Sequence, residues 1–445
     1  MAAEESPFDI VRVWQRQRTE KGWWHSFELP DGTFIEGPNS LAGQKTRIGQ
    51  FPIPEDLTGK RVLDIGAWDG WFSFEMERRG AEVVAIDNWD NPRFREMHAL
   101  LDSRVDYRQM DMYDLTPDRI GRFDVVLFMG VLYHLKHPLL ALERVCALTT
   151  DLACVDSFVL QEKHRPGEGV ERRPIMEFYE TDEMGGQTDN WCGPTVACVL
   201  AFCRAAGFAR VDLRNVLDHG ACIACWRQWD PAPAKAPAGP AVLEAYHHTN
   251  FGLNFDSRVD EYLTAWFEHP VSKLSLDEIQ PEVSGYGVRP IHVDQPEGGR
   301  WQINLKLPPG LTPGWHDVRV RVRGSRPGDA CRIAVDLPIE PVGPVLITGV
   351  ADGTTWTSDQ LELRNGGALS LWVDGLPENA DRNNVRVTLE GTRLPVEWVE
   401  PAKSAPRQLN VRVPLGAPEG PAALGVAVGN ARSEPRPSGS VTIIR

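Results

Sequence analysis

The clearest pattern of hydrophobic and polar positions lies between residues 61 and 87. An apolar run that includes Val62, Leu63 and Ile65 ends in a glycine turn. A helix-like stretch follows and stops at Gly80, and a second apolar run ends at Asp87. A buried run, a tight turn, a helical stretch and another buried run predict a strand, a helix and a parallel strand. This is the opening of a nucleotide-binding α/β domain.

The same alternation of apolar runs and amphipathic stretches continues through the first half of the chain. The pattern predicts seven strands, at residues 61–65, 82–87, 104–108, 123–129, 152–158, 209–215 and 221–227. The last two are expected to form an antiparallel hairpin with a turn at Asp218–Gly220. Seven strands with this ending match the methyltransferase variant of the doubly wound fold. Ligands of such sheets bind outside the carboxyl ends of the strands.

Proline usage changes near residue 230, where 11 of the 35 prolines lie before and 24 after. The stretch 230–241, DPAPAKAPAGPA, predicts a stiff Pro/Ala linker. Short alternating segments then follow, which predict all-β sandwiches: RWQINLKL, HDVRVRVRG, RIAVDL, VLITGV, LSLWVDG, VRVTLEG, LNVRVPL and VTIIR. Residues 243–270, which include DSRVDEYLTAWF, look more helical or mixed and could bridge the two halves.

These changes predict five regions. They are an N-terminal extension or lid (1–55), an α/β domain (56–229), the linker (230–241) and two β-sandwich modules (242–340 and 341–445), with the modules divided near PIEPVGP at 338–344.

Charge and cysteine usage narrow the function. The chain has 47 Lys and Arg against 62 Asp and Glu, a net charge of −15, which argues against a broad nucleic-acid-binding surface. No signal peptide or long apolar span is visible, so we expect no membrane association. The eight cysteines sit mostly in apolar patterns, as small buried hydrophobes do, which suggests a reducing cytoplasm. Cys222 and Cys225 form a single C-x-x-C, and without a second pair we expect a core strand there and no metal site.

The glycine turn indicates the kind of ligand. Gly66 and Gly70 are spaced Gly-x-x-x-Gly, unlike the Gly-x-Gly-x-x-Gly that cradles a pyrophosphate. Asp87 follows about 20 residues after the turn, where an acid accepts hydrogen bonds from ribose hydroxyls. Together these features fit a nucleoside ligand without phosphates, of which S-adenosylmethionine is the commonest, although an ordinary strand-to-helix turn is the alternative. The cofactor-binding candidates from this part are Asp64 (toward the ammonium group), Gly66, Ala67, Trp68, Gly70, Asp87 and Asn88.

The ends of the next two strands add further candidates. Asp111 and Met112 could bind and pack beside an adenine, with a surface acid as the alternative. Met129 and Gly130 end the fourth strand under the cofactor. Tyr133 could hydrogen-bond the cofactor or offer its ring to the sulfonium. His134 suits general-base work near neutral pH, and a histidine that caps the loop is the alternative.

Two segments could contact the substrate. The stretch 176–195 lies where loops commonly form lids or substrate walls, and it supplies the candidates Glu177, Tyr179, Asn190 and Trp191. A surface loop with a helix cap is the alternative. The N-terminal WWHSFELPDG (23–32) could close over the cleft or cover the sheet edge, with His25 as a second base. Lys45 could reach an anionic substrate group, or could be a solvated lysine.

Residues 20–228 resemble class I S-adenosylmethionine methyltransferases, in the branch of the tRNA wobble-uridine 5-oxyacetic acid methyltransferases. The resemblance is carried by LPDG (29–32), LTGKRVLDIGAWDGWFSFEM (57–76), FDVVLFMGVLYHLKHPLLAL (123–142) and DNWCGPTVACVLAFCRAAGF (189–208). The tail, with QINLKLPPGLTPGWHDVRVRV (302–322), resembles bacterial immunoglobulin-like modules. Such modules usually bind, space or dimerise, so a homo-oligomer formed through them is possible.

The resemblance has implications for the reaction. One enzyme of this branch transfers a carboxymethyl group and grips the added carboxylate with a Lys, a Tyr and an Arg. Tyr133 falls on the tyrosine, but no equivalent of the Lys or of the Arg is found here, which favours ordinary methyl transfer. Related bacterial proteins with the WWH…LPDG pattern look like companions of glycosyltransferases, which suggests a glycan or another small hydroxylated acceptor.

The sequence therefore predicts a methyltransferase that moves the sulfonium methyl to an oxygen or nitrogen of such an acceptor. The alternatives are a tRNA wobble-uridine methyl- or carboxymethyltransferase and a non-catalytic scaffold that binds S-adenosylmethionine.

Overall fold

The fold was analysed in a computed structural model. It describes residues 22–170, 173–218, 220–249, 254–297, 299–337, 343–378, 380, 382, 385–401, 405–428, 431–433 and 441–445. The first 21 residues of the expected N-terminal extension and residues 338–342 of the expected module boundary lie outside these ranges. The chain forms two compact units. One ends at Trp229 and includes Pro308–Gly310, and the other comprises Asp230–Leu307 and Leu311–Arg445.

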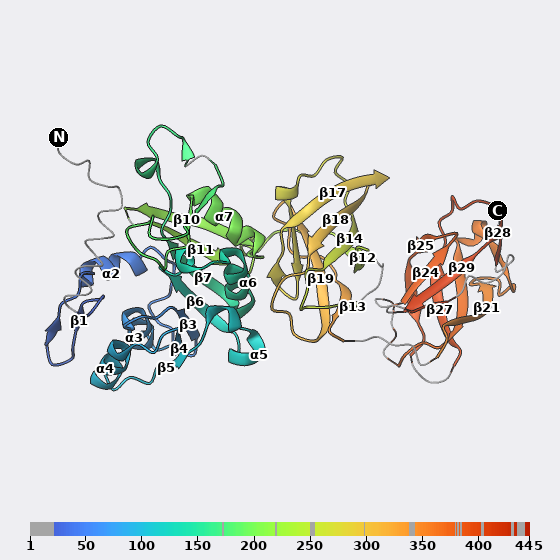
Figure 1. Cartoon of the computed structure of the whole chain (residues 1–445). Coiled ribbons are helices and arrows are strands. Elements are labelled where there is room, and N and C mark those ends of the chain that lie inside the picture. The colour runs from blue at the N-terminus through green and yellow to red at the C-terminus, as the bar shows by residue number, and fades with distance from the viewer. Residues whose placement is uncertain are drawn as a thin grey trace. The chain divides into compact units, whose positions relative to one another are not determined.

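The first unit is built on a seven-stranded sheet with the order β10-β11-β7-β6-β3-β4-β5 (Figure 1). Its strands are β3 (Arg61–Ile65), β4 (Glu82–Asp87), β5 (Asp106–Gln109), β6 (Phe123–Met129), β7 (Thr149–Ser157), β10 (Arg210–Leu217) and β11 (Gly220–Trp226). The first five are parallel, and β11 pairs antiparallel with both β7 and β10. The seven expected strands and the final hairpin are confirmed.

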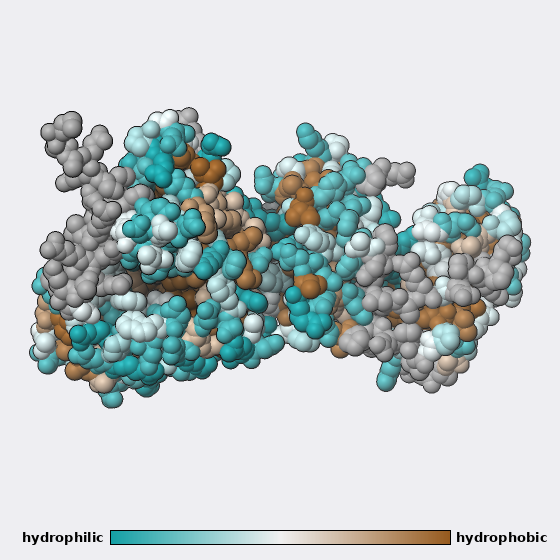
Figure 2. All heavy atoms as spheres, in the orientation of Figure 1, coloured by the Kyte–Doolittle hydropathy of each residue, from teal (hydrophilic) through white to brown (hydrophobic). Residues whose placement is uncertain are grey.

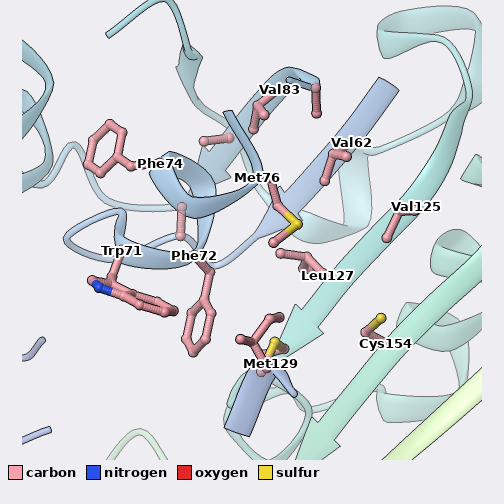
Figure 3. Close-up of a cluster of buried hydrophobic side chains, with 14 of the residues drawn as sticks. Val62, Trp71, Phe72, Phe74, Met76, Val83, Val125, Leu127, Met129 and Cys154 are labelled. Carbon is pink, nitrogen blue, oxygen red and sulfur yellow. The ribbon is translucent and has the colours of Figure 1, made fainter. Parts of the chain in front are cut away.

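Alternate residues of these strands enter two separate cores. Val125 and Leu127 of β6 belong to one core, whereas Val126 and Phe128 belong to the other. A strand covered on both faces has no polar side to show, so it appears in the sequence as a continuous apolar run. Figure 3 shows the first core, in which side chains of α3 (Trp71–Arg78) pack on the strands.

Helices cover both faces of the sheet. Residues of α3 and α4 (Pro92–Leu100) contribute to the first core, and those of α5 (Pro117–Ile120), α6 (Pro138–Leu148) and α7 (Val196–Ala205) contribute to the second. Three of these helices begin with proline, which fits the first turn because its missing N–H would have no intrahelical partner there. Short 3-10 turns follow several strands: η1 (Met112–Asp114), η2 (Leu132–His134) and η3 (Glu162–His164).

The N-terminal segment covers the first face of the sheet. It contains β1 (Phe27–Glu28), β2 (Phe34–Ile35) and α2 (Leu41–Ile48). Trp23, Phe27 and Ile48 are buried in the first core. A further small hairpin, β8 (Met176–Phe178) with β9 (Cys192–Pro194), lies between η3 and α7.

The second unit is β-rich and begins with two sheets that share one core. The four-stranded sheet has the order β12-β14-β18-β17 and the five-stranded sheet β13-β20-β19-β15-β16. Their strands are β12 (Val242–His247), β13 (Asn254–Phe255), β14 (Tyr262–Glu268), β15 (Ile279–Val283), β16 (Tyr286–Gly287), β17 (Pro290–Glu297), β18 (Arg300–Lys306), β19 (Gly314–Val322) and β20 (Cys331–Val335), with η5 (Leu276–Glu278) before β15. Phe267 of one sheet and Val320 of the other belong to the same buried cluster, which identifies a sandwich.

The expectation that residues 243–270 are helical or mixed is wrong, because they contribute β12, β13 and β14. Leu263, Ala265 and Phe267 point into the sandwich core at every second position. The error arose because Leu and Ala are good helix formers. The period of two, not the residue types, decides the structure here.

The remaining strands of the second unit form three further sheets, β21-β23-β27-β26, β22-β31-β28 and β25-β24-β29-β30, around a common core. They are β21 (Leu346–Asp352), β22 (Gln360–Glu362), β23 (Ala368–Asp374), β24 (Val385–Leu389), β25 (Thr392–Leu394), β26 (Val396–Val399), β27 (Arg407–Arg412), β28 (Gly420–Ala422), β29 (Leu424–Val428), β30 (Ala431–Arg432) and β31 (Val441–Ile444), with η6 (Leu363–Asn365) after β22.

The Pro/Ala stretch 230–241 is partly tied to the second unit. The Gly239 N–H donates to the Arg326 carbonyl, and the Arg326 N–H donates to the Pro237 carbonyl.

Much of the visible surface is hydrophilic, with scattered hydrophobic patches (Figure 2). Among the described residues, no helix has both the length and the apolar composition needed to cross a bilayer.

Candidate active site at the carboxyl ends of the strands

The glycine turn after β3 adopts a conformation that ordinary residues rarely take. Gly66, Trp68 and Gly70 all have positive φ, at 73°, 53° and 91°. A Cβ on Gly70 would lie 2.5 Å from Phe74 and 2.8 Å from Phe94, and one on Gly66 would overlap Cγ2 of Val131. Glycine is therefore required at both positions by backbone angle and by space. The absence of a Cβ at these two points lets Val131, Phe74 and Phe94 pack directly against the main chain of the loop.

Asp87 connects this loop to the end of β4. Its carboxylate accepts hydrogen bonds from the backbone N–H groups of Trp68, at 3.0 Å, and Trp89, at 3.2 Å. Burial raises the pKa of Asp87 even though these donors act to lower it. A carboxylate offers about four acceptor positions, so some capacity remains for ribose hydroxyls. The strained backbone of Trp68 is thus stabilised by the residue expected to bind the cofactor.

Asp64 is the next-to-last residue of β3 and is buried. Its carboxylate accepts from the Ser73 hydroxyl at 2.6 Å, and burial raises its pKa to about 6. Ala67 is also buried, and its N–H donates to the Ile86 carbonyl, as does that of Gly66. These contacts fix the loop against β4.

The candidates from the neighbouring loops take several positions. The Asp111 carboxylate caps η1 by accepting from the Tyr113 N–H at 2.8 Å, and Asp111 remains exposed. Met112 is buried in the second core. Asn88 is exposed, and its carbonyl accepts from the Gln109 side chain at 3.0 Å. Asp111 and Asn88 therefore keep exposed side chains beside the ends of β5 and β4.

The end of β6 brings the second group of candidates together. Met129 packs in the first core, where Figure 3 shows it beside Phe72. Gly130 has a φ of 77°. The ring centroids of Tyr133 and His134 lie 4.2 Å apart. Nδ1 of His134 is 3.0 Å from the Asp189 carbonyl, so residues 189–191 lie directly beside this turn.

Arg47 is a site residue that the sequence analysis missed. It makes a bidentate ion pair with Asp156, a buried residue near the end of the apolar strand β7. Its guanidinium lies 5.7 Å from the centroid of the Phe72 ring. A Cβ built on Gly130 would have Nη2 of Arg47 at 3.4 Å and the Tyr133 hydroxyl at 3.9 Å. Both polar groups therefore face the same point above Gly130. The signal in the sequence was Asp156 itself, because an acid in a buried strand needs a partner.

The substrate candidates in the stretch 176–195 pack against this turn. Glu177 forms a bidentate ion pair with Arg165, at 2.8 Å for both contacts, and accepts from the Tyr179 hydroxyl at 3.1 Å. Tyr179 is buried, and burial together with Glu177 raises its pKa strongly. It clusters with Phe158 and Met184, against which Tyr133 packs. These contacts make Glu177 and Tyr179 supports of the wall beside Tyr133.

The other two candidates in this stretch are Trp191 and Asn190, and they make different contacts. The backbone N–H of Trp191 donates to the Tyr133 carbonyl at 2.8 Å. The Lys136 ammonium lies 4.0 Å from the centroid of the Trp191 ring. Asn190 is buried and donates to the Met184 carbonyl and the Gln187 side chain, while its Oδ1 has no partner among the described residues. Asn190 is thus the member of this group with an unused buried acceptor.

His25 and Lys45 lie differently from what their proposed roles require. His25 is buried, and its ring Nδ1 and backbone N–H both contact the Asp69 carboxylate, which also accepts from the Trp24 N–H. This pair fastens the N-terminal segment to the glycine loop, which makes His25 a positioning residue. Asp69 was not predicted. Lys45 is exposed on α2, and Arg47, two residues later, reaches the site instead.

The C-x-x-C motif is part of the core strand β11. Cys222 belongs to the first core and Cys225 to the second, so the two thiols lie on opposite faces of the sheet. Cys222 donates to Asp156 at 3.3 Å. The interpretation as a core strand is confirmed. Within the described ranges, no group of three or more His, Cys, Asp or Glu side chains is arranged to hold a metal ion.

Comparison with known proteins agrees with this geometry. Residues 40–155 match the family model described as a methyltransferase domain. The ubiquinone biosynthesis O-methyltransferase of Xanthomonas oryzae pv. oryzae (strain PXO99A) is 42% identical over 129 residues, 28% of this chain and 50% of that protein. The one from Acinetobacter baumannii (strain ACICU) is 35% identical over 85 residues, 18% of this chain and 36% of that protein. The chain thus spans half or less of these curated relatives.

The chain is also similar to solved structures, two of which are the following. The N-terminal domain of EvdMO1, in the presence of SAH and D-fucose, is 19% identical and covers 50% of this chain and 98% of that one, with a TM-score of 0.35. Magnesium protoporphyrin IX methyltransferase (ChlM) from Synechocystis PCC 6803, with bound SAM, is 14% identical and covers 51% and 100%, with a TM-score of 0.31.

The sheet order, the glycine loop with its acid at the end of β4, and the family match lead to one identification. The first unit contains a class I S-adenosylmethionine-dependent methyltransferase domain.

Proposed function

We propose that the protein transfers the methyl group of S-adenosylmethionine to an oxygen of a small hydroxylated molecule or a glycan, with nitrogen as the other possible acceptor atom. The observation that carries this proposal is the convergence at one sheet edge of the glycine loop, Asp87 and the Tyr133–His134 turn. The names of the curated O-methyltransferases support oxygen as the acceptor atom.

The residues of the loop fit the cofactor. Gly66 and Gly70 hold the loop backbone in left-handed conformations, and Asp87 keeps acceptor capacity for ribose hydroxyls. Arg47 has five N–H donors, of which Asp156 takes two, so the guanidinium can also bind a carboxylate. Bound S-adenosylmethionine supplies a methyl group that its positive sulfur already activates. The protein's task is therefore to hold and orient the acceptor.

His134 is the candidate base because its tautomer can be assigned from its partner. The Asp189 carbonyl can only accept, so Nδ1 carries a proton, and in the neutral imidazole Nε2 is then the nitrogen with the lone pair. An acceptor hydroxyl of high pKa would lose its proton to Nε2. The pair Arg165 and Glu177, through Tyr179, supports the wall on which Tyr133 and this histidine rest.

The experiment is to measure release of S-adenosylhomocysteine from the full chain with a panel of hydroxylated small molecules and saccharides. With a productive acceptor, His134→Ala should lower kcat by about 100-fold. His137→Ala is the matched control, because His137 is an exposed histidine three residues away at the N-cap position of α6, where its side chain makes no capping hydrogen bond. Full activity of the His134 variant at saturating acceptor would refute the base. A chain that binds the cofactor but releases no product with any acceptor would favour the scaffold alternative.

A second candidate is transfer of a carboxymethyl group, as in the wobble-uridine branch. The observation that favours it is the Arg47 guanidinium, which faces the same point as the Tyr133 hydroxyl, where an added carboxylate could bind. Native mass spectrometry of the purified chain, with identification of the released cofactor, distinguishes the candidates. A cofactor heavier by one carboxylate supports carboxymethyl transfer, and unmodified S-adenosylmethionine supports methyl transfer. Steep salt dependence of binding to bulk tRNA would be needed for the wobble-uridine substrate.

For the second unit we propose two immunoglobulin-like modules, with strands 242–335 and 346–444. The shared core of its first two sheets and the alternating pattern of its strands support this.

A further inference from the structure

A hollow on the first sandwich of the second unit is far in sequence from the methyltransferase motifs. Its volume is about 450 Å³, within the range of small-molecule sites. It is lined by Ser284, Gly285, Trp315, Asp317, Arg319 and Arg332. This hollow therefore has the size and the mixed chemistry of a ligand site.

The alternation of β19 places residues 315, 317 and 319 on the face of the strand opposite the core of this sandwich. His316, Val318 and Val320 are buried, whereas Trp315, Asp317 and Arg319 share the opposite face. Trp315 is half-buried because it also packs against the cluster of buried residues in the last strands of the chain, and the rest of its side chain lines the hollow. Arg332 of β20 lies directly across from Asp317 in the register of the two strands. One aromatic ring, one carboxylate and two guanidinium groups thus stand together on a rigid sheet, where a site is held more firmly than on a loop.

The polar groups are held in place before any ligand arrives. Asp317 accepts from Arg319 at 2.9 Å and from Arg332 at 3.1 Å, and Arg319 also donates to the Gly328 carbonyl at 3.0 Å. Partial burial acts to raise the pKa of Asp317, but the hydrogen bonds from the two arginines lower it overall, so the carboxylate is ionised at neutral pH.

The turn at the end of the hollow is equally fixed. Ser284 has a φ of 50°, an unfavourable value for a serine. It is held by a hydrogen bond of its N–H to the Asp317 carbonyl at 2.9 Å and by its hydroxyl against Nδ1 of His316 at 2.7 Å. Strained backbone held by its surroundings is common where ligands bind.

The unused hydrogen-bonding capacity defines the ligand. Arg332 uses only Nε in the contacts among the described residues, so its two terminal nitrogens stay available, and its side chain is 50% exposed. Two guanidiniums against one carboxylate give the lining a net charge of +1 in a chain of −15. Asp317 retains acceptor positions suited to hydroxyl groups. A ligand that uses all these groups has an anionic group, hydroxyls and a flat apolar face.

We propose that this hollow binds a uronic acid unit of a saccharide. The sugar ring packs on Trp315, its carboxylate forms a bidentate pair with Arg332, and its hydroxyls donate to Asp317. A planar guanidinium matches a carboxylate in this way, whereas a doubly charged phosphate would be repelled by Asp317. This site is independent of the proposed methyl transfer, and its test needs no methyltransferase activity.

The experiment is a titration of the full chain, labelled with 5-fluorotryptophan, followed by ¹⁹F NMR. The resonance of Trp315 is assigned with Trp315→Phe. Methyl β-glucuronide should shift this resonance in a saturable way, and methyl β-glucoside, which lacks the carboxylate, should bind at least tenfold more weakly. Arg332→Gln should weaken glucuronide binding by about tenfold, the loss expected for a charge-assisted pair.

Arg258→Gln is the matched control, because Arg258 makes a bidentate pair with Asp256 on an exposed part of the same sandwich and does not line the hollow. It should bind glucuronide as the unaltered protein does, and thermal unfolding should show that both variants are folded. Absence of a glucuronide-dependent shift, equal binding of the neutral glucoside, or unchanged binding by Arg332→Gln would each overturn the proposal.

Discussion

Substitution of Gly66 by alanine tests the cofactor loop most directly. The new Cβ would lie under 3.0 Å from Cγ2 of Val131, and the backbone would keep a φ of 73°. The left-handed conformation costs about 1–2 kcal/mol for a residue with a Cβ, and overpacking costs about 1–3 kcal/mol. We therefore expect Gly66→Ala to lower the free energy of unfolding by about 2–5 kcal/mol, measured by urea denaturation.

Two companion variants separate these contributions. Gly59 has a φ of 75° and no atom within 4 Å of an added Cβ, so Gly59→Ala should show the conformational cost of about 1–2 kcal/mol alone. In the double variant Gly66→Ala/Val131→Ala the methyl that would be overlapped is gone, so part of the packing cost should be recovered. If Gly59→Ala destabilised the protein as much as Gly66→Ala, the packing argument would be wrong.

Cofactor affinity is the functional readout of the same variants. The added methyl group at position 66 would push the loop away from Val131 and displace its backbone, so calorimetry with S-adenosylmethionine should show at least tenfold weaker binding to Gly66→Ala. Gly59→Ala should bind normally. Unchanged affinity of a folded Gly66→Ala would refute the assignment of this loop.

Three further predictions concern buried carboxylates. Asp87→Ala should weaken S-adenosylmethionine binding at least tenfold in calorimetry, whereas Asp90→Ala, an exposed acid paired with Arg95, should not. Arg47→Met should lower the free energy of unfolding by about 3–5 kcal/mol, because it leaves the buried Asp156 without its guanidinium, and Arg47→Met/Asp156→Leu should recover much of the loss; an equal loss in both variants would contradict this. Burial raises the pKa of Asp64 to about 6, above its value near 3.9 in the unfolded chain, so the folded protein binds this proton more tightly. The free energy of unfolding should therefore rise by up to about 3 kcal/mol as the pH falls from 7 through 6 to below 4. Urea denaturation should show that Asp64→Asn loses this contribution, and an identical pH profile would contradict it.

The sequence predicted strand bounds best where both faces of the sheet are buried. The bounds of β3, β4 and β6 were predicted to the residue, because a strand covered on both sides is apolar throughout and ends where the chain meets solvent. The glycine turn after β3 was predicted for a related reason, since backbone geometry restricts the residue types there. In β14, by contrast, Leu and Ala concealed a period of two that extends over only a few residues.

The missed site residues depend on tertiary contacts. Arg47 and Asp156 are 109 positions apart, and Asp69 and His25 are 44 apart, so no local spacing connects them. Lys45 and Arg47 look equivalent in sequence, and only the direction of α2 against the sheet decides which one enters the site. Asp156, an acid within the apolar strand β7, was the sign in the sequence that a distant cation was needed.

The fastening of His25 and Trp24 to Asp69 joins two equilibria. Docking of the N-terminal segment and ordering of the loop from Gly66 to Gly70 share one carboxylate, so each raises the population of the other. By thermodynamic reciprocity, whatever tightens the loop also protects the segment, and a chain shortened past this anchor would hold its ligand less firmly without losing a single direct contact to it.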